Sequence, residues 1–589
     1  MKDAKKLNDM RHSWAHVLAQ AVRKFYPKAK LGIGPTIEDG FYYDFDNVDL
    51  SENDLAKIEK EMRIIAKKNL NIKKEIWPIK KTKEYFKEKN ANYKLELIES
   101  LIKNDRIKEA GIVFTGKGTE DEFIDLCRGG HIKNTKELNT DAFKLMRVAG
   151  AYWRGDEKNP MLTRIYGVAF ETKKELEKYL WQQEEAKKRD HRILGTKLKL
   201  FTFADEVGPG LPLWLPNGTV IREELETYAK KIETQWGYRR VATPHIAKET
   251  LYKMSGHIPY YADDMYPPMK LDDGNYYLKA MNCPHTHMIY KSEPRSYKDL
   301  PLRLAEYGTV YRYELSGVLA GLLRVRGFTQ NDAHIYCRED QAEEEFLTVM
   351  KLHEFWYKKV FRIKDFYMRL SLPSKDSSKY ANTPNGWSKS VKIIRSAMKK
   401  SGLPYTEVTG EAAFYGPKVD FQIKSVIGRE ESASTNQLDF LATERFNLDY
   451  TDKNGNKKPI YVIHRSPLGS HERFIAFLIE HFAGAFPVWL SPAQVWVLPI
   501  SDSFKKYGEE IIKKLKENDL RAELRDEAES LGKKIRNGQI QKIPYLLIVG
   551  EKEKKASSVS VRHREKGDVG TMKVNKFIEK VLKEIADKK

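Results

Sequence analysis

The stretch that decides the fold reads YRYELSGVLAGLLRVRGFTQ and spans residues 311–330. Two strand-like runs, residues 304–313 and 328–335, flank its central loop, because aromatic and β-branched residues recur in both. Two arginines, Arg312 and Arg324, lie near the ends of these runs. A strand, a loop and a second strand predict two neighbouring strands of one sheet.

Around this stretch, strand-like runs alternate irregularly with long helical stretches. Further strand candidates are residues 239–242, 419–423 and 437–441, and the helical stretches include residues 221–235 and 341–359. Strands and helices without a regular βαβ alternation favour an α+β fold with a largely antiparallel sheet.

The two ends of the chain have patterns of their own. Residues 11–26 carry apolar side chains at helical spacing, and residues 41–45 form an aromatic, strand-like run. The Lys/Glu-rich residues 171–189 indicate a connecting helix, or else a surface helix of a neighbouring domain. A compact βαβ-type domain is predicted at the C-terminus, with strands at 495–499, 521–524, 545–549 and 558–562 and helices at 504–518, 531–542 and 573–586.

These patterns predict a multidomain α+β chain. Its expected parts are an N-terminal α+β domain (1–172), a helical linker (173–192), a central antiparallel-sheet domain (193–488) and a C-terminal α/β domain (489–589). The length of 589 residues fits three or four domains of about 100–200 residues each.

The chain is strongly basic, with a net charge of +21. This excess favours a polyanionic partner, because lysine and arginine displace counterions from phosphates, although a basic proteome or a need for solubility would also explain it. The three cysteines are too far apart for a disulfide framework. No apolar run approaches the ~18 residues of a membrane helix, and residues 1–10 do not form a signal peptide. We therefore expect a cytoplasmic protein that binds nucleic acid and no membrane.

Three separated motifs point to one kind of chemistry. They are GYRRVATPH (237–245), YRYE with RVRGFTQ (311–314 and 324–330), and GSHERF at the head of a helix (469–474). Any one alone is weak, but the three in this order resemble the signature motifs of class II aminoacyl-tRNA synthetases. The resemblance implies an antiparallel-sheet catalytic core, ATP-dependent activation of an amino acid, and a homodimer formed through the first motif.

Adenylate formation brings an anionic carboxylate to an anionic phosphate, and arginine can neutralise both with a fixed, permanently charged fork. By resemblance, Arg312 holds the α-phosphate of ATP, Arg473 the γ-phosphate, and Arg324 the leaving pyrophosphate. Glu314 would accept a hydrogen bond from the adenine amino group, and Phe328 would stack on the ring. Mg²⁺ would bridge the phosphates.

Further stretches resemble the threonyl-tRNA synthetase family over essentially the whole chain. They are MNCP (281–284), RGFTQNDAH (326–334), FYGPK (414–418) and VIHR (462–465). The resemblance implies threonine, ATP and tRNA(Thr) as substrates. A prolyl or seryl synthetase, or a non-catalytic RNA-binding paralogue, are the rival hypotheses.

The same resemblance implies one zinc ion per subunit, held by Cys283, His334 and His464. Spacing alone would favour a local cluster in the stretch CPHTH, where His285 and His287 follow Cys283. An apolar pocket separates the isosteres threonine and valine by only ~10²-fold, whereas a metal can bind threonine through its amino and hydroxyl groups.

The resemblance also implies a set of substrate residues around that metal. Asp332 would accept from the threonine hydroxyl, and Gln330, Tyr415, Met281 and Gln437 would line the pocket. Gln437 would border the ATP as well. For Tyr415 and Gln437, structural packing is an equally good interpretation.

Zinc cannot exclude serine, which carries the same two groups, so such an enzyme needs a hydrolytic second site. The stretch HSWAH places His12 and His16 on one face of a helix, and DLCRGGH adds Cys127 and His131. This tetrad resembles the editing site of threonyl and alanyl synthetases, with Lys94 as a further member. A zinc site or structural histidines are the alternatives.

The resemblance implies four further residue assignments and one absence. Arg536, Glu553 and Arg562 would contact anticodon bases, although each alone is a surface charge. His257 would assist transfer to tRNA, or be structural. Many bacterial relatives begin with a small ubiquitin-like domain, and because His12 lies so near the first residue we expect that domain to be missing here.

Overall fold

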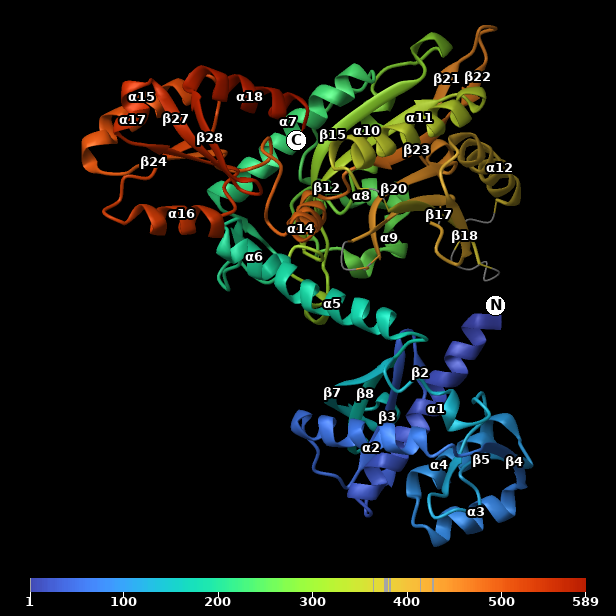
Figure 1. Cartoon of the computed structure of the whole chain (residues 1–589). Helices are drawn as coiled ribbons and strands as arrows, with labels where there is room; N and C mark the ends of the chain where they lie inside the picture. Colours follow the sequence, from blue (N-terminus) through green and yellow to red (C-terminus); the bar gives the residue numbers. More distant parts are fainter. Residues whose placement is uncertain are drawn as a thin grey trace. The chain divides into compact units, whose positions relative to one another are not determined.

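The computed structural model describes residues 2–363, 365–374, 380, 383–413, 415–425, 428 and 430–588, so that Phe414 of the stretch FYGPK lies outside the described residues. The chain divides into two compact units, Met1–Glu184 and Glu185–Lys589 (Figure 1). None of the described helices combines the length and the hydropathy that a membrane span requires. The bounds of the four predicted domains stay a prediction.

The first unit is built on two sheets and a long helix, α1 (Lys2–Phe25). In sheet order, one sheet contains β1 (Lys30–Leu31), β3 (Gly40–Asp46), β8 (Met161–Ala169) and β7 (Phe143–Tyr152), and the other β4 (Ile72–Pro78), β5 (Glu109–Thr115) and β6 (Phe123–Leu126). Helix α1 buries Trp14, Val17 and Leu18 against the first sheet, as its apolar spacing predicts. Its N-terminal end, however, extends well beyond the expected residues 11–26.

An eight-stranded sheet forms the centre of the second unit (Figure 1). In order, its strands are β11 (Arg239–Arg240), β15 (Leu302–Tyr311), β16 (Gly327–Cys337), β23 (Tyr461–Ser466), β20 (Glu430–Asp439), β19 (Lys418–Lys424), β17 (Phe366–Leu372) and β18 (Tyr405–Thr409). Neighbours are antiparallel except at the two edges, where β11 is parallel to β15 and β18 to β17. The α+β fold with a largely antiparallel sheet is confirmed.

Side chains alternate along β16 between a covered face and the opposite face. Ala333 and Ile335 pack into the main hydrophobic core of this unit. The helices that contribute to this core include α7 (Pro216–Gln235), α11 (Ala342–Glu354) and α14 (His471–Phe482). Because successive residues of a strand point to opposite faces, Asp332 and His334 face away from the helices.

The structure differs from the predicted elements at three places in this unit. Only residues 437–439 of the expected strand 437–441 belong to β20, because Asp439 Oδ1 accepts from the next backbone N–H groups and turns the chain into α13 (Ala442–Phe446). The expected helix 341–359 changes at Glu354 into a π-helical turn, Phe355–Val360. In the expected strand 239–242, only the first two residues pair with β15.

The C-terminal part contains every predicted strand and helix. Its sheet order is β25 (Ala522–Leu524), β24 (Val495–Pro499), β26 (Tyr545–Val549), β27 (Ser558–His563) and β28 (Gly567–Lys573), with helices α15 (Lys505–Lys516), α16 (Leu531–Ile540) and α18 (Val574–Ala586). Strand β28 and the short helix α17 (Glu551–Lys555) were not predicted. Most of β28 is exposed and polar, so it carries no alternating apolar pattern.

A buried ion pair ties α7 to the sheet. Arg465 of β23 lies 2.8 Å from Glu233 of α7, and both side chains are almost fully buried. The Arg465 guanidinium also lies 4.2 Å from the centroid of the Tyr238 ring. Removing one member of such a pair leaves an uncompensated buried charge.

We therefore expect Glu233→Ala to lower the free energy of unfolding of this unit by about 3–5 kcal/mol. The measurement is the denaturant midpoint followed by tryptophan fluorescence. Glu223→Ala, on an exposed position of the same helix, is the control and should leave the midpoint nearly unchanged. Equal midpoints for the two variants would contradict a stabilising role of the pair.

Candidate active site

Three potential metal ligands converge on the face of the central sheet opposite α7, α11 and α14. Cys283 begins helix α10 (Cys283–Lys291), and His334 pairs directly across the β16–β23 ladder with His464. One ligand atom from each residue lies within 4.8 Å of the other two. Strand register thus brings together His334 and His464, which are 130 positions apart, and α10 adds Cys283 from 51 positions before His334.

The surroundings of this group suit a divalent cation. His334 Nε2 is buried and has no hydrogen-bond partner among the described residues, so its lone pair is available. Burial holds the pKa of His334 well below its usual value, which keeps the ring neutral. For His464, burial lowers the pKa, but the Cys283 sulfur and Asp439, whose Oδ2 lies 3.2 Å from Nε2, outweigh it and raise the pKa to about 10. The negative field that holds a proton on His464 would equally favour a metal ion.

The alternative cluster in the stretch CPHTH is not formed. Among the described residues, Cys283, His285 and His287 do not constitute a group with converging ligand atoms. His287 Nδ1 instead lies 3.0 Å from the Tyr336 hydroxyl, and burial lowers the pKa of His287 to about 3. His287 can form a second group with Asp439 and His464.

The expected substrate residues lie next to this group. Asp332 is buried, which raises the pKa of its carboxyl, and its Oδ2 accepts from Asn282 Nδ2 at 3.0 Å. Asn282 also contacts Gln330 at 3.5 Å. Sequence reasoning overlooked Asn282, although it lies within the quoted stretch MNCP. It orients the carboxylate that would receive the threonine hydroxyl.

Tyr415, Gln437 and His257 border the same place from other elements. The Tyr415 hydroxyl donates to Gln437 Oε1, and Gln437 is the register partner of His464. His257 Nε2 lies 2.7 Å from the sulfur of Met281, and its Nδ1 lies 2.7 Å from the Ser255 hydroxyl. Burial lowers the pKa of His257 to about 4, so the ring is neutral near pH 7.

A cavity of about 450 Å³ adjoins these residues, and we call it the arginine cavity. Its lining includes Arg312, Arg324, Arg473, Phe328, Glu314, Gln330 and Gln437, all of which the sequence analysis singled out. The Arg312 guanidinium lies 5.2 Å from the centroid of the Phe328 ring, and Arg312 Nε is buried without a hydrogen-bond partner among the described residues. Arg473 Nε donates to the Leu323 carbonyl at 3.2 Å, and burial lowers the pKa of this arginine.

Within this cavity, the Glu314 carboxylate forms an ion pair. It lies 2.8 Å from Arg324, which is the group that the resemblance assigns to pyrophosphate. The role expected for Glu314, acceptance from an adenine amino group, would therefore require this ion pair to open or to be shared.

Three charged residues of the arginine cavity were not predicted as site residues. Lys418 lies 2.9 Å and Arg369 3.8 Å from the carboxylate of Asp420. Lys418 could have been predicted from the sequence, since it ends the quoted stretch FYGPK. Arg369 and Asp420 face each other only because β17 pairs with β19, and no local signal reveals that pairing.

The expected editing tetrad also assembles, within the first unit. His12 and His16 lie on α1, and Cys127 and His131 lie in the loop after β6. The Cys127 sulfur is 3.4 Å from His12 Nε2 and 3.2 Å from His131 Nε2. Two glycines with positive φ, at positions 129 and 130, allow the tight loop that returns His131 to the thiol.

Lys94 joins a buried polar network beside the tetrad. Its Nζ lies 2.5 Å from Asp125 and 3.1 Å from the Tyr43 hydroxyl, and that hydroxyl donates to Asp125 at 2.5 Å. His16 lies 3.8 Å from the same carboxylate. His16, Lys94 and Asp125 line a cavity of about 770 Å³, together with His12 and Cys127. Asp125 and Tyr43 were missed, although both lie in stretches that the sequence analysis noted.

The three predicted anticodon residues lie on separate elements of the C-terminal part. Arg536 is exposed on α16, and Arg562 is the register partner of Leu546, which packs on the same face of the sheet as α16. Glu553 accepts from the Gly550 backbone N–H at 3.0 Å and so caps α17. A structural role is thus visible for Glu553.

Comparisons with known proteins agree over the whole chain. Family models match for the tRNA synthetase class II core domain (G, H, P, S and T) at residues 268–482, the anticodon binding domain at 494–584, and the threonyl and alanyl tRNA synthetase second additional domain at 112–166. The threonine–tRNA ligase of Gloeobacter violaceus is 47% identical over 584 residues, covering 98% of this chain and 92% of that protein. The chain belongs to the threonyl-tRNA synthetase family.

Other relatives of the synthetase support the same assignment. The threonine–tRNA ligase of Deinococcus radiodurans is 49% identical over 562 residues, covering 94% of this chain and 85% of that protein. The crystal structure of the RNA binding domain of threonyl-tRNA synthetase from Cryptosporidium parvum superposes with a TM-score of 0.64 at 34% identity, covering 67% of this chain and 98% of that one. The synthetase activates threonine with ATP and transfers it to tRNA, and its second additional domain fits hydrolytic editing.

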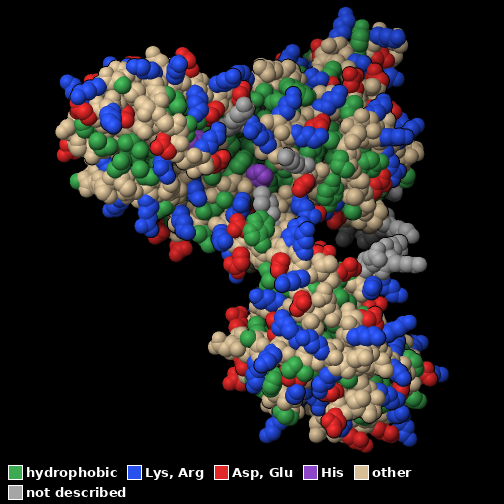
Figure 2. Space-filling model, viewed as in Figure 1, with side chains coloured by type: hydrophobic (Ala, Val, Ile, Leu, Met, Phe, Trp, Pro, Cys, Tyr) green, Lys and Arg blue, Asp and Glu red, His purple; other side chains and the backbone are tan. Residues whose placement is uncertain are grey.

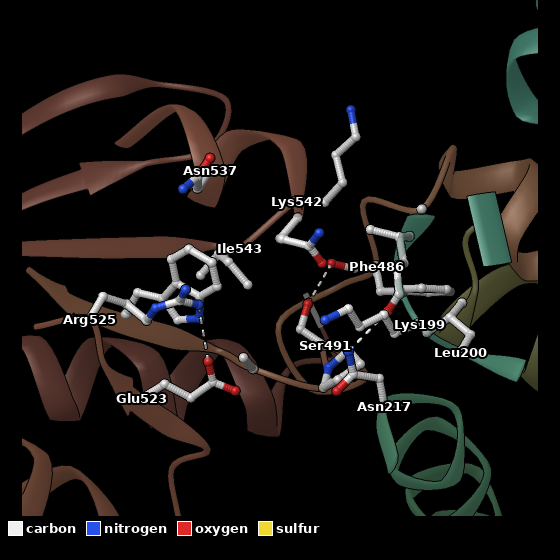
Figure 3. Close-up of a pocket in the computed structure, with 16 residues that line it drawn as sticks. Lys199, Leu200, Asn217, Phe486, Ser491, Glu523, Arg525, Asn537, Lys542 and Ile543 are labelled. Atoms are coloured by element: carbon white, nitrogen blue, oxygen red, sulfur yellow. Dashed lines mark hydrogen bonds and ion pairs between the residues drawn. The ribbon is translucent and has the colours of Figure 1, made fainter. Parts of the chain in front are cut away.

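The surface of the synthetase suits a nucleic-acid substrate. Lysine and arginine are spread over the face seen in Figure 2, in keeping with the net charge of +21. A further cavity, of about 430 Å³, lies between the central and C-terminal parts of the second unit (Figure 3). Lys199, Arg525 and Lys542 line it, whereas the three predicted anticodon residues do not. Sequence reasoning gave no indication of this cavity.

The reactivity of Cys127 provides a test of the first unit's geometry. Burial raises the pKa of the Cys127 thiol to about 11, and only the thiolate reacts with alkylating agents. We expect the rate of Cys127 alkylation by iodoacetamide to rise about tenfold per pH unit from pH 7 to pH 9.5 without levelling. Peptide mass spectrometry follows Cys127 separately from the other cysteines. The unfolded chain, the control, should level off near pH 8.5, and the same plateau in the folded chain would contradict the burial.

Proposed function

We propose that the synthetase selects threonine through a zinc ion held by Cys283, His334 and His464. The observation that supports this most directly is the buried Nε2 of His334, which has no hydrogen-bond partner within the described part of the chain and converges with the Cys283 sulfur and the His464 ring. Three protein ligands leave a coordination position open for substrate. Bound there, zinc would supply a Lewis acid for the amino and hydroxyl groups of threonine, which valine cannot satisfy.

The residues of the chain then divide the activation step among themselves. Asp332, oriented by Asn282, accepts from the threonine hydroxyl. Arg312 and Arg473 neutralise the α- and γ-phosphates of ATP in the arginine cavity, and Mg²⁺, when bound with ATP, would supply further positive charge there. Catalysis is mostly positioning and electrostatic stabilisation.

The transfer step uses groups that border the same site from other elements. Tyr415 and Gln437 form a hydrogen-bonded pair that lines the pocket, and His257 is held by Ser255 near Met281. A neutral His257 can accept the proton of the attacking tRNA hydroxyl directly or through these neighbours. Arg536 and Arg562 read anticodon bases of tRNA(Thr), and the protein works as a cytoplasmic homodimer.

The zinc hypothesis makes a joint prediction. Cys283→Ser should remove the metal and threonine activation together, because a hydroxyl is a far weaker zinc ligand than a thiolate. Metal content by mass spectrometry should be one zinc per chain for the unchanged protein. Cys337→Ser, at a buried cysteine outside the group, is the control and should keep the metal. A metal-free preparation with full threonine-dependent pyrophosphate exchange would sink the hypothesis.

We further propose that the first unit hydrolyses seryl-tRNA. Zinc cannot reject serine, because serine carries both groups and lacks only a methyl that is worth about 1–3 kcal/mol. In the tetrad of His12, His16, Cys127 and His131, the first three residues line a cavity of about 770 Å³, and Lys94 lines it alongside them. The ester is labile, so the pocket need only hold a water and stabilise the developing oxyanion.

His12→Ala combined with Cys127→Ala should therefore abolish hydrolysis of seryl-tRNA, since loss of one positioned donor commonly costs ~10²–10³ in rate. Threonine activation should stay intact, because its residues lie in the second unit. The measurement is accumulation of seryl-tRNA from serine and ATP, which should be small for the unchanged protein and steady for the double variant. If both accumulate it equally, the first unit does not edit. If the variant also loses threonine activation, the tetrad is a structural metal site.

A further inference from the structure

His191 lies outside every motif used so far, yet it contacts two elements that line the arginine cavity. It is the first residue of α6 (His191–Lys197) and is only 2% exposed. Its Nδ1 lies 2.7 Å from Glu480 Oε1 in the last turn of α14. Its Nε2 lies 3.1 Å from the backbone nitrogen of Leu322, in the loop 312–326 between β15 and β16.

The two contacts fix the position of the proton on this ring. A backbone N–H can only donate, so Nε2 accepts the hydrogen bond from Leu322 and carries no proton. Nδ1 then carries the proton and donates it to the Glu480 carboxylate. Both ring nitrogens are therefore occupied, and none is left to bind a metal ion together with Asp190 and Glu480. His191 Nε2 thus provides the hydrogen-bond acceptor that the buried Leu322 N–H requires.

The loop is shaped to receive this histidine. Gly321 has a φ of +52°, and a Cβ at this position would lie 2.3 Å from His191 Nε2. Leu322 is fully buried in the main core, which anchors the loop from the other side. Within the loop, the backbone nitrogen of Ala320 donates to the Arg324 carbonyl at 3.2 Å and closes a tight turn. A side chain at position 321 would separate this turn from α6.

Helix α14 holds the same loop at a second point. Arg473 and Glu480 are seven residues apart, so they lie on one face of α14 about 10 Å from each other. Arg473 donates to the Leu323 carbonyl directly, while Glu480 reaches the adjacent Leu322 through His191. Two consecutive loop residues are thus bound to the two ends of one helix face.

The end of the preceding helix strengthens this arrangement. Arg189 donates to the Glu480 carbonyl at 3.4 Å and to the His481 carbonyl at 3.0 Å, both of which belong to the last turn of α14. The His191 backbone N–H points at the Glu480 carboxylate at 3.3 Å. Residues 189–191 therefore clamp the C-terminal turn of α14.

We propose that His191 is a positioning residue for threonine activation. In its neutral form, protonated at Nδ1, it fixes the loop 312–326 on α14, so that Arg312 and Arg324 of the loop face the same cavity as Arg473. The phosphates of ATP need these three cations in a fixed geometry before the reaction, because electrostatic stabilisation depends on groups that do not have to reorganise. The inference rests on the proposed placement of ATP in the arginine cavity.

The test is threonine-dependent ATP–pyrophosphate exchange by the full chain. For His191→Ala we expect kcat/KM for ATP to fall about 10- to 100-fold, since a displacement of ~1 Å can cost ~10²-fold, while KM for threonine changes less than twofold. Lys197→Ala, an exposed side chain on the same helix, is the matched control and should leave both parameters unchanged. A fall of less than twofold for His191→Ala would overturn the proposal, as would an equal loss of ATP and threonine affinity.

Two conservative variants separate the loop contact from the Glu480 contact. The amide oxygen of His191→Gln reaches the position of Nε2 and can accept from Leu322, so it should recover at least fivefold over His191→Ala. The amide of His191→Asn reaches only the position of Nδ1, so it keeps the Glu480 contact and should remain as low as alanine. Recovery by asparagine and not by glutamine would overturn the proposal.

Two further measurements keep the outcome unambiguous. Should His191→Ala not fold, Gly321→Ala breaks the same contact from the loop side and should give the same selective loss of kcat/KM for ATP; unchanged ATP kinetics there would overturn the proposal. Arg473→Ala is measured alongside. If Arg473→Ala also leaves ATP kinetics unchanged, ATP does not bind in the arginine cavity and the proposal fails with that placement. If only the Arg473 variant is impaired, the placement stands and the role of His191 is refuted.

Discussion

The pairing of β16 with β23 is the constraint on which the active site depends. Register alone places His334 opposite His464, and the period of two along each strand sends their neighbours Ala333, Ile335 and Ile463 into the core. A slip by one residue would exchange the two sets and put imidazoles into the core. The apolar side of β16 thus guarantees the position of the polar side, and helices α7, α11 and α14 hold the register by burying the apolar side.

Burial then decides the chemistry of each group. Burial lowers the pKa of His334 and keeps its ring neutral. The pKa of His464 is raised instead, because the Cys283 sulfur and Asp439 outweigh the effect of burial. In the first unit, Cys127 is kept as a thiol by the same desolvation. The two sites use similar residue types, yet their neighbours shift the pKa values of those residues in different directions.

The sequence predicted much of this molecule, for reasons that differ from element to element. Helix α1 and strands β15, β16 and β24 were predictable because their apolar periodicity is strong and local. Cys283, His334 and His464 could be grouped only through family resemblance, since spacing favoured the stretch CPHTH. Arg369, Asp420 and His191 carried no signal, because their partners come from distant strands, helices and loops. Strand β28 was missed because its side chains are mostly exposed and polar.

The strand pairing of the first unit has a consequence for folding during synthesis of the chain. Every strand in those sheets finds its partners within residues 1–184, so this unit can fold as soon as it leaves the ribosome. The central sheet cannot, because β16 must wait for β23, some 130 residues later, before His334 meets His464. At about 5–20 residues per second this delay is on the order of ten seconds. The first unit of a nascent chain is therefore complete well before His334 and His464 come together.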